Sequence, residues 1–99
     1  MELYIKRKGV IVTEICEQYL LAACKEAREY CPYITEINET SAYIWNCMSS
    51  EKGVSSKQLL QAVLKEYEID DLALAEQTIQ EFLDEMIRCG YVFIAEGES

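Results

Sequence analysis

Apolar and polar residues follow the period of strands in the first third of the chain and the period of helices after it. Residues 10–15 (Val-Ile-Val-Thr-Glu-Ile) are rich in β-branched types, and residues 18–23 have a similar composition, so both ranges predict strands. Only two residues separate them, which predicts a tight hairpin. After a polar stretch, residues 33–37 predict a third short strand. Pro32 at its start is typical of an edge strand, because proline has no N–H to donate.

Helical periodicity dominates after this strand. The predicted N-caps of three helices are Asn38, then Ser55 or Ser56, then Asp70 or Asp71. Their predicted buried stripes are Ile44, Trp45 and Met48 in the first, Leu59, Leu60, Val63, Leu64 and Tyr67 in the second, and Ala75, Ile79, Phe82, Leu83, Met86 and Ile87 in the third. Gly90 is expected to end the third helix at its C′ position. Residues 91–94 are a candidate for one more strand.

These elements predict one α+β domain over residues 1–99, because 99 residues are too few for two. Short connections favour a three-stranded antiparallel sheet followed by three helices that pack on it. If its edge is open, the third strand exposes N–H and C=O groups to which an extended peptide can add as a further strand. The alternative is that proline and the short length of the strand only protect that edge.

The charge is unevenly distributed. Residues 1–65 carry as many basic as acidic side chains, whereas Arg88 is the only base in residues 66–99, so the net charge of −9 lies in the last third. Phosphate backbones and anionic membranes are bound through Lys and Arg, so we expect neither nucleic acid nor membrane as a partner. A basic or neutral peptide fits this charge better. A solvated acidic helix face that only keeps the protein soluble would explain the same charges.

The residues needed for common active sites are missing. The chain has no histidine, so Ser-His and Cys-His nucleophile pairs cannot be built, and its four glycines are isolated. The five cysteines are odd in number and never spaced as CxxC, which predicts neither a zinc site nor a disulfide framework. We therefore expect no enzyme activity and no cofactor. Reduced cysteines, no apolar run of roughly 18 residues and no signal peptide indicate a cytoplasmic protein.

Four segments in order resemble the PqqD family. Residues 37–48 (Ile-Asn-Glu-Thr-Ser-Ala-Tyr-Ile-Trp-Asn-Cys-Met) are similar to its L-N-E-T-(G/A)-x-x-I-W-x-x-(L/M) signature. Residues 54–60 resemble its second helix start, residues 66–70 (Glu-Tyr-Glu-Ile-Asp) its E-Y-(D/E)-(V/I)-(D/S) link, and residues 82–92 its closing F-L-x-x-L-x-x-x-G-(L/Y)-(L/V). The resemblance covers about residues 8–94. One departure is residues 24–29, which lack the family's turn glycine and predict a longer or distorted connection.

The resemblance implies a winged-helix-like fold that recognises peptides. Family members bind the leader segment of a ribosomally synthesised precursor peptide as an added strand and present it to a modifying enzyme, often a radical S-adenosylmethionine enzyme. Carried onto this sequence, the strand and the wall of the third helix give the expected peptide-binding residues: Tyr33, Ile34, Thr35, Glu36, Ile37, Glu76, Ile79, Gln80, Leu83 and Ile87. The spacing leaves open which flank of the helix faces the groove.

Two other functions stay open at this point. A winged-helix transcription regulator would share the fold outline, although the third helix is acidic where a DNA reader would be basic. An adaptor that binds only a protein partner would need no leader peptide. The precursor, the modification, the enzyme and the oligomeric state are all left open by the sequence.

Overall fold

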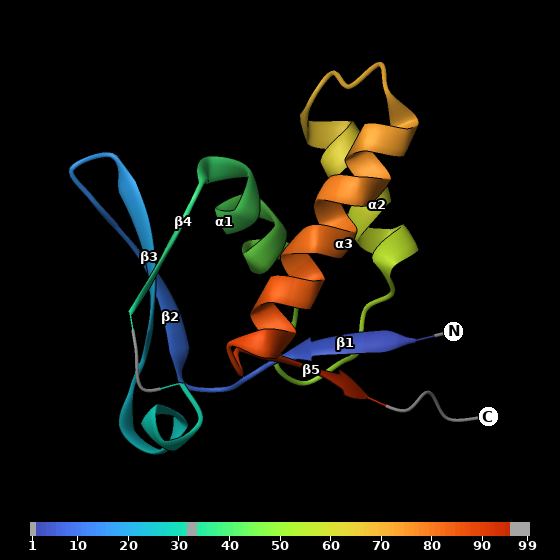
Figure 1. Ribbon diagram of the computed structural model, residues 1–99. Coiled ribbons are helices and arrows are strands. Elements are labelled where there is room, and N and C mark those ends of the chain that lie inside the picture. Colours follow the sequence, from blue (N-terminus) through green and yellow to red (C-terminus); the bar gives the residue numbers. More distant parts are fainter. Residues whose placement is uncertain (1, 32–33, 96–99) are drawn as a thin grey trace.

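The strands form two separate sheets in the computed structural model, which describes residues 2–31 and 34–95 (Figure 1). Strands β2 (Val10–Ile15), β3 (Gln18–Ala23) and β4 (Thr35–Ile37) form an antiparallel sheet in the order β2-β3-β4. Strand β1 (Leu3–Lys6) pairs antiparallel with β5 (Val92–Ala95). The α+β class and the three-stranded sheet are confirmed. The candidate last strand exists, but it joins β1, a strand that the sequence pattern did not predict.

The turns around β3 explain how a chain with few glycines makes this sheet. Cys16 and Glu17 both have positive φ, 52° and 65°, as a two-residue type I′ hairpin turn requires. The connection to β4 contains a 3₁₀ helix, η1 (Lys25–Glu29), whose first residue has φ 54°. The connection that was expected to be longer or distorted is thus a short helix, and its first residue, Lys25, has the left-handed backbone conformation.

Three helices follow: α1 (Glu39–Cys47), α2 (Ser56–Glu66) and α3 (Leu72–Arg88). Their N-caps are the predicted Asn38, Ser55 and Asp71, and each side chain accepts a hydrogen bond from a backbone N–H of the first turn. At Ser55 the Gln58 side chain accepts in return from the cap N–H, which completes the capping box. Local sequence therefore decides where each helix begins.

The helices supply most of the hydrophobic core. Trp45 of α1 and Tyr91 after α3 are each 1% exposed, and their rings meet edge to face with centroids 6.3 Å apart. The predicted stripe of α3 is buried apart from Ile87, which is partly exposed. Leu21 of β3, at 0% exposure, is the fully buried residue that the three-stranded sheet contributes to this core, and the partly buried Val10, Val12, Ala23 and Ile37 pack against it. The central strand of the sheet therefore reaches deepest into the core.

Gly90 joins the end of α3 to the segment that precedes β4. Its φ of +87° is the left-handed C′ conformation predicted for it. A Cβ at this position would lie 2.6 Å from the Tyr30 carbonyl oxygen. The Gly90 carbonyl accepts hydrogen bonds from Arg7 Nε (2.7 Å) and Cys31 Sγ (3.1 Å). Any residue with a Cβ would clash with the Tyr30 carbonyl, so only glycine allows these two backbone segments to lie so close. The contact holds the segment that leads into β4 beside the C-terminal end of α3.

Within the described parts of the chain, no helix is both long and apolar enough to cross a lipid bilayer.

Candidate functional site

Strand β4 forms one edge of the three-stranded sheet. Its residues Thr35–Ile37 pair antiparallel with residues 19–21 of β3. Among residues 2–31 and 34–95, no strand pairs with its other side. The backbone N–H and C=O groups on that side are therefore available to an added strand.

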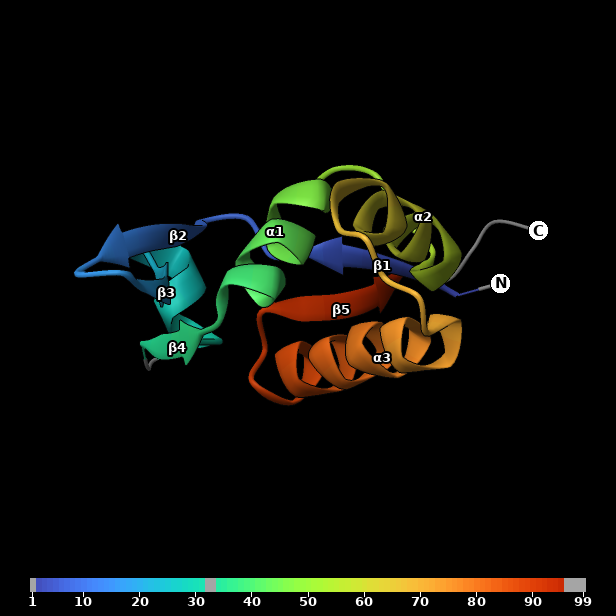
Figure 2. The ribbon, with the colours of Figure 1, turned by 90° about the horizontal axis from the view of Figure 1, so that it is seen from above.

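A cavity of about 390 Å³ lies beside this edge, between β4, the first turn of α1 and α3. In Figure 2, β4 and the C-terminal part of α3 lie on the same side of α1. Phe82 and Met86 of α3, which are 6% and 2% exposed, form the apolar floor. The full lining is Thr35, Glu36, Ile37, Asn38, Ser41, Thr78, Glu81, Phe82, Glu85 and Met86. A strand edge with a helical wall is the geometry that peptide capture by strand addition uses. We call this cavity the β4–α3 groove.

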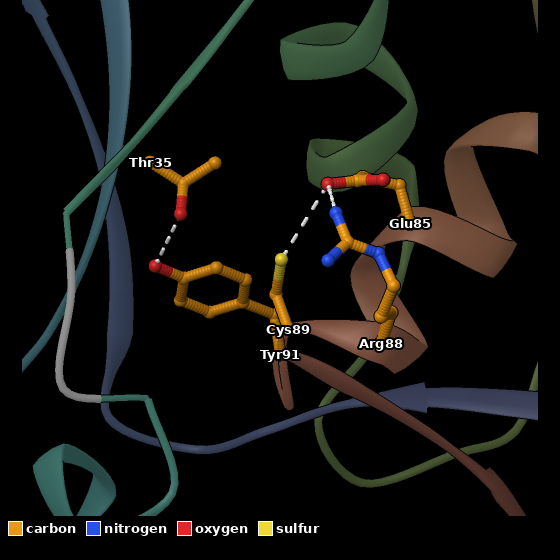
Figure 3. Close-up of polar contacts among 5 residues, drawn as sticks. All are labelled: Thr35, Glu85, Arg88, Cys89 and Tyr91. Atoms are coloured by element: carbon orange, nitrogen blue, oxygen red, sulfur yellow. Dashed lines mark hydrogen bonds and ion pairs between the residues drawn. The ribbon is translucent and has the colours of Figure 1, made fainter.

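A buried tyrosine fixes the beginning of β4. The hydroxyls of Thr35, which lines the groove, and Tyr91 share a hydrogen bond of 2.9 Å (Figure 3). Burial raises the pKa of the Tyr91 phenol above its ordinary value of 10.0, so the group is neutral at pH 7. The bond therefore joins two uncharged side chains and positions β4 against the end of α3.

The rim of the groove on α3 is acidic. Glu85 accepts from the Arg88 guanidinium, and its Oε2 also lies 3.6 Å from the Cys89 thiol (Figure 3). Burial, followed by the charge of Glu85, raises the pKa of Cys89 and keeps it a thiol. Glu81 lies one turn earlier and accepts from Gln77 Nε2 at 3.1 Å. The rim thus offers carboxylate oxygens to an approaching chain.

The structure brings together most of the strand residues predicted for the site. Thr35, Glu36 and Ile37 all line the groove. Ile34 precedes β4 and is 68% exposed. Tyr33 lies outside the described residues. Peptide contact by any of them stays a prediction.

The predicted helix residues lie elsewhere. Glu76, Ile79 and Gln80 line a second cavity of about 410 Å³, between α2 and α3. Leu83 is fully buried, and Ile87 is a partly buried residue packed on the core. The flank of α3 at the groove carries other residues, namely Thr78, Glu81, Phe82, Glu85 and Met86. The sequence pattern had placed Phe82 and Met86 in the buried stripe of this helix, but it gave no reason to prefer either polar flank.

Comparison with solved structures identifies a similar fold. TbiB1 in complex with the TbiA(beta) leader peptide matches with a TM-score of 0.66, over 96% of this chain and 98% of that one. The sequence identity is 16%, so this likeness concerns the fold alone.

Comparison with curated protein sequences finds no match.

Residues 33–92 match the family model of coenzyme PQQ synthesis protein D (PqqD). This range holds the β4 strand, the three helices and the groove between them. It is more than half of the chain, and the resemblance seen in the sequence motifs is thereby confirmed. The chain belongs to the PqqD family.

Proposed function

We propose that this chain captures the leader segment of a ribosomally synthesised precursor peptide and presents it to a modifying enzyme. The leader would add to β4 as an antiparallel strand and lie in the β4–α3 groove. The observation that carries the proposal is the open β4 edge beside the groove in a PqqD-family chain. The similarity in fold to TbiB1, which was solved with a leader peptide, supports it.

The chain would contribute recognition and no chemistry. It has no histidine, so it cannot supply the Ser-His or Cys-His pairs on which many peptide-modifying reactions depend. A separate enzyme would act on the bound precursor, and a radical S-adenosylmethionine enzyme is the class we expect. Strand addition leaves the segment beyond the leader free, so that the enzyme can reach it.

The first test is an NMR titration. Labelled protein is titrated with synthetic peptides that correspond to the N-terminal segments of short precursors encoded next to this gene. We expect shifts concentrated on residues 34–37 and 78–86, with the β2 amides at Val10–Ile15 as an internal control. Binding that shifts only residues remote from the groove would overturn strand addition at β4. No binding by any segment would favour an adaptor that recognises only a protein partner.

The enzyme partner needs its own experiment. The radical S-adenosylmethionine enzyme encoded closest to this gene is purified, and modification of the precursor is followed by mass spectrometry with and without this chain. We expect modification to need the chain and to fail when the leader is deleted. Equal modification without the chain would contradict its role in presentation.

A further inference from the structure

The β4–α3 groove has a charge of one sign. Glu36, Glu81 and Glu85 line it, and the described lining residues include no Lys or Arg. Beneath the two helix carboxylates, Phe82 and Met86 form a buried apolar floor. An occupant therefore meets hydrocarbon at the floor and negative charge at the rim. A purely apolar side chain would give the rim carboxylates no partner in the peptide, and an acidic side chain would be repelled.

The spacing of the two helix carboxylates matches that of an added strand. Glu81 and Glu85 are one helical turn apart, a rise of about 6 Å. In an extended peptide, side chains at alternate positions point to the same face and lie about 6.8 Å apart. Two groove-facing side chains, two residues apart in the peptide, can therefore each reach one carboxylate.

Lysine and arginine are the side chains that satisfy floor and rim together. Their aliphatic stems can cover Phe82 and Met86 while the charged ends reach the carboxylates. Arginine adds two parallel hydrogen bonds to a carboxylate, and lysine acts as a point charge. No other residue type offers a long apolar stem that ends in a cation.

A guanidinium just outside the groove lining already pairs with one of these carboxylates. Arg88 donates to Glu85, and the two side chains are 70% and 48% exposed. An exposed ion pair of this kind is worth little, so an incoming cation can replace Arg88 at small cost. The Arg88 contact shows that the Glu85 carboxylate, which lines the groove, accepts from a cation.

We infer that the groove selects leader segments in which two basic residues stand at alternate positions and face Glu81 and Glu85. This inference rests on the proposed function, because it assigns specificity to the same groove. The expected partner is an extended, basic peptide segment in which one residue of any type separates two Lys or Arg residues. It also gives part of the acidity of residues 66–99 a purpose beyond solubility.

A random library of 12-residue peptides displayed on phage tests the inference without knowledge of the natural leader. The library is panned on wild-type protein and on the charge-reversed variant Glu81→Lys with Glu85→Lys. Wild-type protein should enrich Lys or Arg two positions apart, and the variant should enrich Asp or Glu at the same spacing. The best wild-type peptide should lose about tenfold in affinity on the variant, because like charges then face each other.

Two controls separate local charge from net charge. Glu68→Lys with Asp70→Lys makes the same change in net charge on the exposed loop between α2 and α3, and should enrich the same peptides as wild type. On the peptide side, a version with the two basic residues adjacent keeps the composition and should bind more weakly. If the charge-reversed variant does not fold by circular dichroism, Glu81→Gln with Glu85→Gln replaces it, with loss of the basic enrichment as the expected result.

The outcomes distinguish the inference from the function on which it rests. Selected peptides are added to labelled protein, and the amide shifts of Thr35–Ile37 are recorded. Peptides that shift β4 but show no basic enrichment would overturn the specificity and leave strand addition standing. Peptides that bind without shifting β4 would overturn the proposed function itself. Basic enrichment with β4 shifts, reversed on the charge-reversed variant, is the result we expect.

Discussion

The three-stranded sheet has two edges, and they differ in what lies beside them. Strand β2 is the longer edge, six residues against three, and it exposes Ile11 and Ile15 at 50% and 52%. Strand β4 is short, but a 390 Å³ cavity with a helical wall adjoins it. Figure 2 shows β4, rather than β2, on the side of α3. By edge length and exposed apolar area alone, β2 would be the better template for an added strand.

The difference indicates that an open edge is necessary for peptide capture but not sufficient. Main-chain hydrogen bonds supply affinity at either edge, whereas a wall with pockets supplies specificity. An edge without a wall is mainly a liability for aggregation. In this fold the wall comes from α3, and the hydrogen bond of Tyr91 to Thr35 fixes β4 against it.

The largest effect is expected from detaching the sheet from the helices. Leu21 is the one fully buried residue of β2, β3 and β4, all of which the structure describes. Leu21→Ala should lower the free energy of unfolding by about 2–5 kcal/mol, through lost burial and the cavity left behind. Ile11→Ala, on the exposed β2 edge, should change it by less than about 0.5 kcal/mol. Urea unfolding followed by circular dichroism measures both, and equal losses would mean that the buried Leu21 anchors the sheet no more firmly than the exposed β2 edge does.

The next effect concerns the main chain of the bound peptide. Methylating the backbone nitrogen of each peptide residue in turn removes one donor at a time. If the peptide adds to β4, every second methylation should weaken binding about tenfold, and the intervening ones should have little effect. Fluorescence anisotropy with the best library peptide measures this series. A flat profile would contradict strand addition, and amide protection at Val10–Ile15 would assign binding to the β2 edge instead.

A smaller effect is expected from loosening β4 alone. Tyr91→Phe removes the hydroxyl that pairs with Thr35, at a cost of about 0.5–1.5 kcal/mol. Amide exchange should become faster in β4 and stay unchanged in β2. Thr35→Val serves as the matched partner, and the double variant should lose less than the sum of the two single losses. Additive losses would mean that the hydroxyl pair does not hold β4 in place.

The helix boundaries were predictable from sequence because their causes are local. Asn38, Ser55 and Asp71 cap helices by accepting bonds from N–H groups three residues away. The buried stripe of α3 was predictable for the same reason, since it depends only on helical periodicity. The hairpin was predicted from its length, although Cys16 and Glu17 are not typical turn residues.

The elements that were missed depend on distant parts of the chain. Strand β1 is four residues long and has no strong pattern of its own, and its partner β5 lies at the opposite end of the sequence. The flanks of α3 are both polar, with Glu76 and Gln80 on one and Glu81 and Glu85 on the other. In the folded chain the first flank lies beside α2 and the second beside β4. No spacing within α3 encodes that choice, so the groove wall could not be assigned from sequence.

The smallest effect is a loss of stability at alkaline pH, to which all tyrosines and cysteines with a raised pKa contribute, Tyr4, Tyr19, Tyr43, Tyr67 and Cys89 among them. Burial raises the pKa values of Cys31 and Tyr91 above their ordinary values of 9.0 and 10.0. The folded state therefore holds these protons more tightly than the unfolded state. The stability they contribute is complete below about pH 8 and is lost as pH rises through 9 and beyond. Burial lowers the pKa of Lys6 below 10.5, which opposes the trend near that pH.

Urea unfolding between pH 7 and pH 10.5 measures this dependence. The free energy of unfolding should be level up to about pH 8 and then fall, and Tyr91→Phe should fall less steeply because one of the titrating groups is gone. Strand β2 contains no tyrosine or cysteine, so Thr13→Val on that edge should leave the slope unchanged. If Tyr91→Phe kept the wild-type slope, the pKa of the Tyr91 phenol would have to be the same in the folded and the unfolded state. It would then have to be more open to water than its 1% exposure indicates, and the firm anchoring that distinguishes β4 from β2 would fail at this point.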